Sequence, residues 1–519
     1  MKGNKYLDNF LNSRIIESDI YRGGGGAMHP VTITYIGGGS KSWAHKYFGD
    51  LLTQELLCGE LRLYDIDLPA AQRNLRYFNK LVKDNAGTVK SSWRCSVETD
   101  LDTALRGADF VIISILPYKL KNMAVDVHHP ERCGIWQPVG DTVGPGGYSR
   151  MLRTFPAYRL FAQRIRENCP DAWVINYTNP MAMCINTLYQ EFPEIKAFGC
   201  CHEVFGTQEI LVRILNLYLQ LSDRGKEAFL QADLQAVKAE LKVLGKKFNL
   251  REFGGMDRRA LDTTVQGTNH FTWLSRAHYR GLDLFPVYGA FVRLFQQDIA
   301  ATSRPGVPPI IRRFRHRESV KYELFARYGR VAAAGDRHLV EFLPEDYLRS
   351  NKTRSKGFVL TSVRGRIWGE RIKKLQLFRD NLPFGKARFK TSGEEGVQQI
   401  TALYGLKDMT TNVNLPNRGQ ITNLPLGTAV ETNAHFTKDS VVPLDTGKMT
   451  EETAALVRRH AQNQKDFVEA WFTWDKRALR EIFCGDPAVA RLDQAAGERL
   501  FEEMIQKNRD CLEPFLLER

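Results

Sequence analysis

The chain has 519 residues, of which 43% are hydrophobic and 25% charged, a composition typical of a globular protein with room for two large or three ordinary domains. No apolar run approaches the roughly 18–20 residues of a membrane helix, and the first residues lack the apolar core of a secretory signal. These features argue against a membrane protein and favour a cytoplasmic location.

The cysteines and the net charge narrow the class of protein further. The nine cysteines include no Cys-x-x-Cys pair, which argues against a zinc ribbon or a redox dithiol and favours free thiols. The net charge of +14 has two explanations, an arginine-rich surface or the attraction of an anionic ligand. Because no recognised nucleic-acid-binding motif accompanies this charge, we expect no nucleic-acid partner.

The N-terminal part of the chain alternates between strand and helix patterns. Residues 1–27 end in a run of four glycines before Met28, and we interpret them as an extension outside the core. The alternation that follows predicts an α/β fold with a Rossmann-like, doubly wound parallel sheet over residues 28–200. The expected strands are 31–36, 61–65, 110–115 and 173–176, and the expected helices are 41–57 and 68–84.

Beyond residue 200 the pattern changes to longer helices. Apolar spacing predicts helices at 208–247, 361–381 and 451–481, around an Asn/Pro/Gly-rich stretch from 411 to 433. We therefore expect residues 201–519 to form a second domain of mixed α+β, largely helical structure.

A glycine-rich turn follows the first expected strand. Gly37, Gly38 and Gly39 precede Ser40, and glycines at such a turn let a pyrophosphate approach the amide groups at a helix N-terminus. The second strand ends in Asp65, whose carboxylate can accept hydrogen bonds from ribose hydroxyls, which favours NAD over NADP. Two departures weaken the match to the dinucleotide-binding pattern Gly-x-Gly-x-x-Gly. Ser42 stands at the third glycine position, and Asp65 lies further from the turn than usual. The alternative for Asp65 is a cap at the strand end.

Two short segments combine cysteine and histidine. The first runs from Phe198 to Gln208 and contains adjacent cysteines followed by a histidine; the second runs from Gln266 to Trp273 and contains His270. Thiolate and imidazole can together hold a divalent cation and leave positions open for a substrate. From spacing alone, the stronger interpretation is that these cysteines and histidines occupy ordinary core or surface positions.

A set of motifs in a fixed order resembles the family 4 glycoside hydrolases. The fuller segments 201–208 and 335–342 look most like the α-galacturonase branch of that family. The motifs are Tyr35-Ile-Gly-Gly-Gly-Ser40, Val143-Gly-Pro-Gly-Gly147, Asn176-Tyr-Thr-Asn-Pro180, Gly199-Cys-Cys-His202, Gly267-Thr-Asn-His270 and Asn412-Val-Asn-Leu-Pro-Asn417.

The resemblance implies cleavage of an α-linked uronide with NAD and a divalent metal, with Mn²⁺ as the expected ion. In that family's reaction C3 of the sugar is oxidised, the C2 proton is removed with help from the metal, the glycosidic oxygen is eliminated, water is added and the ketone is reduced again. The alternatives are an α-galactosidase or α-glucosidase of the same family, or a 2-hydroxy-acid dehydrogenase. The resemblance also implies an acidic sugar as substrate and a homodimer or homotetramer.

The resemblance assigns roles to several residues by motif. Cys201 and His270 would be the metal ligands, with Cys200 as the adjacent rival. His202 would be a proton donor or a substrate contact. Asp141 matches an acidic position used in catalysis or binding, and Asn179 would hold sugar hydroxyls.

The base that takes the C2 proton is not fixed by the motifs, because the family commonly uses tyrosine in the region that here contains Arg337 and His338. We expect Asp336 to serve as this base. A uronate carboxylate would pair with an arginine of the site. For each candidate arginine, a position on the protein surface is an equally good interpretation. The candidates are Arg312, Arg337, Arg364 and Arg366.

Overall fold

The computed structural model describes residues 28–244, 257–300, 318–348, 361–380, 382 and 385–518, except for the side chains of residues 297–300. The predicted extension 1–27 and Arg312 lie outside these residues. Among the described helices, none combines the length and the apolar character needed to cross a membrane.

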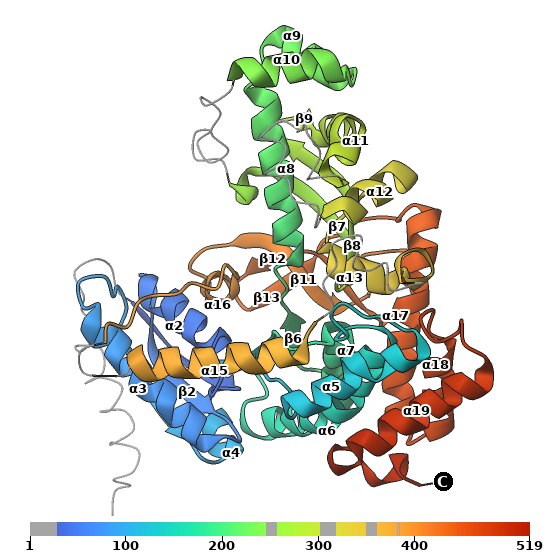
Figure 1. Ribbon diagram of the computed structural model, residues 1–519. Helices are drawn as coiled ribbons and strands as arrows, with labels where there is room; N and C mark the ends of the chain where they lie inside the picture. Colours follow the sequence, from blue (N-terminus) through green and yellow to red (C-terminus); the bar gives the residue numbers. More distant parts are fainter. Residues whose placement is uncertain are drawn as a thin grey trace, which may run out of the picture.

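A nine-stranded sheet forms the body of the molecule (Figure 1). Six strands are mutually parallel in the order β3-β2-β1-β4-β5-β6, the strand order of a dinucleotide-binding fold. Three antiparallel strands from the C-terminal half extend the sheet beyond β6. The strands are β1 (His29–Ile36), β2 (Leu57–Tyr64), β3 (Trp93–Glu98), β4 (Phe110–Ile113), β5 (Trp173–Asn176), β6 (Lys196–Gly199), β11 (Met409–Pro416), β12 (Ala429–Thr437) and β13 (Ser440–Pro443).

Helices cover both faces of this sheet, because its central strands are apolar on both sides. Separate apolar cores lie under the two helical layers. One layer contains α4 (Leu101–Leu105), α6 (Gly144–Asn168), α7 (Met181–Glu191), α17 (Glu451–Phe472), α18 (Lys476–Gly485) and α19 (Gln494–Asn508). The other contains α2 (Trp43–Thr53), α3 (Leu68–Asp84) and α16 (Gly396–Leu403), with α15 (Val363–Asp380) contributing Leu377.

The third helix shows how the sequence sets these elements. Asp67 caps α3 by accepting a hydrogen bond from the Ala70 N–H, and a proline occupies the first turn, where its missing N–H costs nothing. Ala70, Asn74, Tyr77 and Leu81 follow at spacings of three and four residues and form the buried face.

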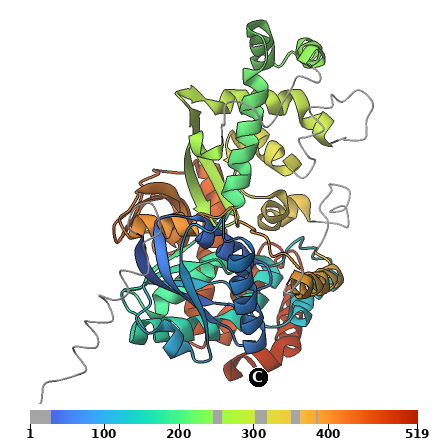
Figure 2. The same cartoon turned by 90° about the vertical axis from the view of Figure 1, so that its left-hand side faces the viewer.

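A second lobe stands above the body in both views (Figures 1 and 2). Helix α8 starts directly after β6, and a small antiparallel sheet with order β10-β8-β7 packs against the lobe's helices around their own core. The lobe contains α8 (Glu203–Leu219), α9 (Asp223–Leu230), α10 (Leu234–Leu244), β7 (Asp262–Thr268), β8 (Phe271–Tyr279), β9 (Leu282–Asp283), α11 (Leu284–Ala300), α12 (Ser319–Tyr328) and β10 (Val331–Ala332).

Shorter elements complete the chain. Helices α13 (Asp336–Phe342) and α14 (Pro344–Tyr347) lie at the junction of lobe and body, and α5 (Leu120–His128) packs beneath α15. Single 3₁₀ turns occur at Pro130–Cys133, Arg258–Ala260, Arg509–Cys511 and Pro514–Leu516.

The predicted fold class is confirmed: a Rossmann-like parallel sheet is followed by a largely helical part with short strands. The helix at 68–84 and the strand at 173–176 have the predicted bounds. The division at residue 200 stays a prediction, although β11–β13 from the second part pair with the first sheet.

Candidate functional site

The glycine turn joins β1 to α2 at the carboxyl ends of the parallel strands. Gly37 has φ +98°, and a Cβ there would lie 2.1 Å from the Ser114 carbonyl oxygen. A Cβ on Gly39 would lie 2.7 Å from the Ala70 Cβ. Side chains are therefore excluded from the turn, which stands beside β4 where the strand order reverses, the usual position of a dinucleotide pyrophosphate.

Ser40 and Asp65 hold this turn in shape. The Ser40 hydroxyl accepts a hydrogen bond at 3.1 Å from the N–H of Trp43, the first residue of α2. The Asp65 carboxylate accepts hydrogen bonds from Gly39 and Asp67 N–H groups, both at 2.8 Å. Asp65 therefore acts as the cap at the strand end that the sequence offered as its alternative role. A contact between its remaining lone pairs and a ribose stays a prediction.

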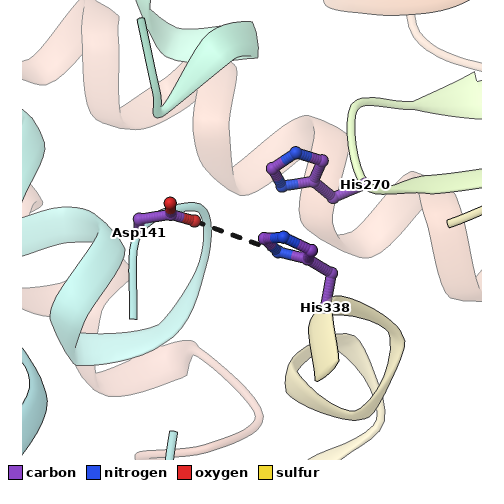
Figure 3. Close-up of side chains that lie close together, drawn as sticks. All are labelled: Asp141, His270 and His338. Carbon is purple, nitrogen blue, oxygen red and sulfur yellow. Dashed lines mark ion pairs between the residues drawn. The ribbon is translucent and has the colours of Figure 1, made fainter. Parts of the chain in front are cut away.

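Three side chains from distant segments meet between the body and the lobe (Figure 3). Asp141, His270 and His338 each place a ligand-type atom within 4.8 Å of the others. The two imidazole rings are 3.8 Å apart between centroids, and the His338 Nδ1 is 3.9 Å from Asp141 Oδ1. Two imidazoles and a carboxylate form a donor set suited to a divalent transition-metal ion.

His270 occupies the two-residue turn between β7 and β8, where it has φ +65°. A left-handed backbone at a residue other than glycine is uncommon and marks a candidate functional position. The Thr142 hydroxyl donates to Asp141 Oδ1 at 2.8 Å, so it accepts a hydrogen bond from the His270 Nδ1–H at 2.7 Å. This arrangement leaves the His270 Nε2 lone pair free for a metal ion.

His338 lies in the first turns of α13, between two carboxylates. Its Nε2 is 3.9 Å from the Glu203 Oε1, and its Nδ1 is shielded from solvent without a hydrogen-bond partner among the described residues. Glu203 is itself fixed by the Gly335 N–H, which donates to its Oε2 at 2.6 Å. A ring held between two carboxylates is well placed to accept and release a proton.

Cys201 and His202 connect β6 to α8, directly before Glu203, and the group of ligand atoms formed by Asp141, His270 and His338 does not include the predicted ligand Cys201. Cys201 is buried, and burial followed by the nearby Glu431 and Glu203 charges raises the pKa of its thiol. The His202 Nδ1 is 2.8 Å from Glu394 Oε1, and half of its side chain is exposed. The ring of Trp43, at the start of α2, lies 6.0 Å from that of His202, so the segment between β6 and α8 lies close to the glycine turn.

The charges in this group set its protonation state. Burial would raise the pKa of Asp141, but His338, Arg150 and His270 more than offset it and hold this pKa well below its usual value. Burial also opposes the ionisation of Glu203, yet the neighbouring histidines lower its pKa to about 2. Burial and the His338 charge lower the pKa of His270 to about 3. Near neutral pH the carboxylates are therefore ionised and His270 is neutral, the state in which it binds a metal ion.

The structure does not bring Asp336 to this group. Its carboxylate accepts hydrogen bonds from the N–H groups of Val320 at 2.8 Å and Lys321 at 3.3 Å, and it pairs with the Lys321 ammonium at 3.6 Å. Asp336 and His338 are two residues apart in α13, and helix positions two apart point to opposite sides. Asp336 thus anchors α12, and His338 stands where Asp336 was expected.

The two predicted substrate-binding residues occupy different environments. The Asn179 Oδ1 is shielded from solvent and, within the described part of the chain, has no hydrogen-bond partner, so it can accept a bond from a sugar hydroxyl. Arg337 donates to the Pro138 carbonyl oxygen at 2.5 Å and to the Thr361 hydroxyl at 2.7 Å. Arg364 is exposed.

Sequence profiles of known families match both halves of the chain. The profile of the family 4 glycosyl hydrolases matches residues 32–217, and the profile of their C-terminal domain matches residues 265–489. The chain belongs to glycosyl hydrolase family 4. It is therefore an enzyme of the class that hydrolyses O-glycosyl bonds.

Among its curated relatives, the family 4 enzyme is more similar to an α-galacturonidase than to an α-galactosidase. An α-galacturonidase of Thermoanaerobacter italicus is 42% identical over 94% of this chain and 98% of its own. An α-galactosidase of Bacillus subtilis is 28% identical over 88% of this chain and 92% of its own.

Solved structures agree with the fold of the family 4 enzyme. The Bacillus subtilis protein lplD superimposes with a TM-score of 0.78 at 39% identity, covering 92% of this chain and 100% of that one. A 6-phospho-α-glucosidase from gut microorganisms, in complex with NAD and Mn²⁺, has a TM-score of 0.68 at 18% identity, with coverages of 93% and 99%.

Sequence reasoning missed His338, Glu203 and Thr142 in this family 4 enzyme. Glu203 directly follows the predicted Cys201-His202 pair, and Thr142 directly follows Asp141. A helix that begins at Asp336 carried a usable signal for His338. Asp336 and His338 are two positions apart in this helix, so only one of them can face the site.

Proposed function

We propose that this family 4 enzyme cleaves α-linked galacturonides with bound NAD⁺ and a divalent cation, Mn²⁺ first among them. The observation that carries the proposal is the 42% identity to an α-galacturonidase over 98% of that protein, against 28% to an α-galactosidase. The excess of arginine around Asp141 supports an anionic substrate.

The residues present fit both groups. The side-chain-free turn at Gly37–Gly39, followed by Ser40, whose hydroxyl accepts from the Trp43 N–H, fits the pyrophosphate of a dinucleotide. His270, through its free Nε2, and Asp141 would hold the cation, since their ligand atoms lie close together in the structure. Cys201 would join them as a ligand on the strength of its sequence motif, although it lies outside the group of ligand atoms formed by Asp141, His270 and His338. When bound, NAD⁺ supplies a reversible hydride acceptor for C3 of the sugar and the cation supplies a Lewis acid at its hydroxyl oxygens.

The side chains around these groups then divide the proton transfers. His338, held between Asp141 and Glu203, would take the C2 proton. His202, oriented by Glu394, would protonate the departing glycosidic oxygen, because its hydrogen bond to Glu394 and the charge of that residue outweigh burial and raise its pKa. Asn179 would accept a hydrogen bond from a sugar hydroxyl.

Assays with p-nitrophenyl α-galacturonide, α-galactoside and α-glucoside, each with and without NAD⁺, Mn²⁺ and a thiol reductant, test this function. We expect cleavage of the galacturonide that requires both NAD⁺ and metal, stops with a chelator and leaves no accumulated NADH. Preference for a neutral glycoside would move the enzyme to another branch of the family. Full activity in excess chelator after removal of NAD⁺, or stoichiometric NADH, would contradict the proposal. Assembly into a homodimer or homotetramer and a cytoplasmic location stay predictions.

A further inference from the structure

Arg150 is a buried cation near Asp141, closest to the carboxylate oxygen Oδ2, whereas His338 is closest to Oδ1. It lies in the second turn of α6, is 8% exposed, and its Nε is shielded from solvent without a hydrogen-bond partner within the described ranges. In the same part of the chain its one ion-pair partner is Asp141, whose Oδ2 is 4.0 Å from its Nη1, beyond hydrogen-bond distance. A buried guanidinium with unmet donors is costly, so this position calls for an anionic ligand.

Two further arginines lie around the same carboxylate. Arg337 is held beside the loop that carries Asp141, through the Pro138 carbonyl oxygen and the Thr361 hydroxyl. Arg366 stands in the first turn of α15, exposed as a residue but with its guanidinium partly buried. Burial first, and then the charges of Arg150 and Arg337, lower the pKa of Arg366, while Asp141 raises it. Arg150, Arg337 and Arg366 thus lie close enough to one another to interact electrostatically, and their positive charge exceeds the single negative charge of Asp141.

The position of this arginine group relative to the reacting atoms is set by Asp141. Its Oδ1 faces Thr142 and His338, and its Oδ2 faces Arg150. In a pyranose ring C6 lies on the edge opposite C2 and C3, so a sugar with C2 and C3 at His338 and His270 would present C6 to other side chains around Asp141, among which is Arg150.

We propose that Arg150, with Arg337 and Arg366 around it, binds the C6 carboxylate of the uronide substrate. This inference rests on the proposed function and adds the residues that select the acidic sugar. A carboxylate accepts two parallel N–H donors from a guanidinium, which lysine cannot supply in the same geometry. The other anion within reach is the pyrophosphate of NAD⁺, because Lys41 next to the glycine turn pairs with Glu370 of α15 at 3.1 Å.

Steady-state kinetics of the full-length enzyme with p-nitrophenyl α-galacturonide, combined with NAD⁺ titration, separate these ligands. We expect Arg150→Gln to lower kcat/KM by about 10²- to 10³-fold, mainly through KM, with unchanged NAD⁺ affinity. Arg150→Lys should recover about tenfold of that loss. The exposed Arg366→Gln should lose about tenfold without a change in melting temperature, and Arg371→Gln, on the same helix and also exposed, should match the wild type.

The outcomes distinguish this inference from the proposed function. If the wild type does not cleave the galacturonide, the proposed function fails. If it does, and Arg366→Gln and a folded Arg150→Gln keep the wild-type KM, the carboxylate site is wrong. A fall in NAD⁺ affinity by the same factor as kcat/KM would assign the arginines to the pyrophosphate and overturn the inference.

Discussion

Replacing Cys201 by serine is expected to lower kcat/KM for an α-galacturonide by about 10³-fold, which corresponds to about 4 kcal/mol of transition-state stabilisation. The thiolate binds a borderline cation as an anion, whereas a serine hydroxyl stays protonated near neutral pH and binds it weakly. The apparent affinity for Mn²⁺, measured by activity against metal concentration, should fall at least about tenfold.

Cys200 provides the matched control for this substitution. It is the adjacent buried cysteine, and its thiol donates to Gln399 Oε1 at 3.1 Å, a bond that a serine hydroxyl can replace. Cys200→Ser should therefore keep both the rate and the Mn²⁺ affinity within about threefold of the wild type. Loss of Mn²⁺ affinity in Cys200→Ser with normal behaviour in Cys201→Ser would reverse the assignment of the metal ligand.

Replacing His338 by asparagine is expected to lower kcat by about 10²- to 10³-fold, because the carboxylates of Asp141 and Glu203 that remain nearby have lowered pKa values and are weak bases. The amide keeps polar atoms near Asp141 and Glu203, so the site should stay folded. If His338 acts as the base, the affinity for Mn²⁺ should change by less than about threefold. Restoration of the full rate at high Mn²⁺ concentration would instead make His338 a metal ligand.

Asp336 is the control for this position, two residues earlier in the same helix. Its carboxylate anchors α12, so Asp336→Asn should lower the melting temperature while the folded enzyme keeps kcat within a few-fold of the wild type. A loss of kcat of the His338→Asn size in a stably folded Asp336→Asn enzyme would show that the structural assignment of the base is wrong.

Local patterns in the sequence predicted the nucleotide-binding half well. The strand ending at Ile36, the turn at Gly37–Gly39 and the capped helix at 68–84 are set by neighbouring residues, through side-chain shape, backbone freedom and capping. The four-residue strand Lys196–Gly199 and the C-terminal strands 409–443 escaped notice. The pairing of Asn414 with Gly199, which joins these strands into one sheet, links residues more than 200 positions apart and leaves no local pattern.

The candidate site was predictable only in part for the same reason. Cys201, His202 and His270 stand in recognisable motifs, but their neighbours come from other segments of the chain. The contact of His338 with His270 depends on how α13 packs against the β7–β8 turn. The unmet hydrogen-bond donor at the Arg150 Nε depends on the burial of this side chain beside Asp141. Neither fact is encoded in a local pattern.

Hydrolysis of p-nitrophenyl α-galacturonide to completion in D₂O, followed by NMR of the released galacturonate, tests most directly whether a carbon-bound proton is removed during turnover. A route through the C3 ketone requires removal and return of the C2 hydrogen, so the product should carry deuterium at C2. Complete hydrolysis to galacturonate with only protium at C2 would contradict this route and, with it, the proposed roles of the glycine turn, of Cys201 with His270, and of His338.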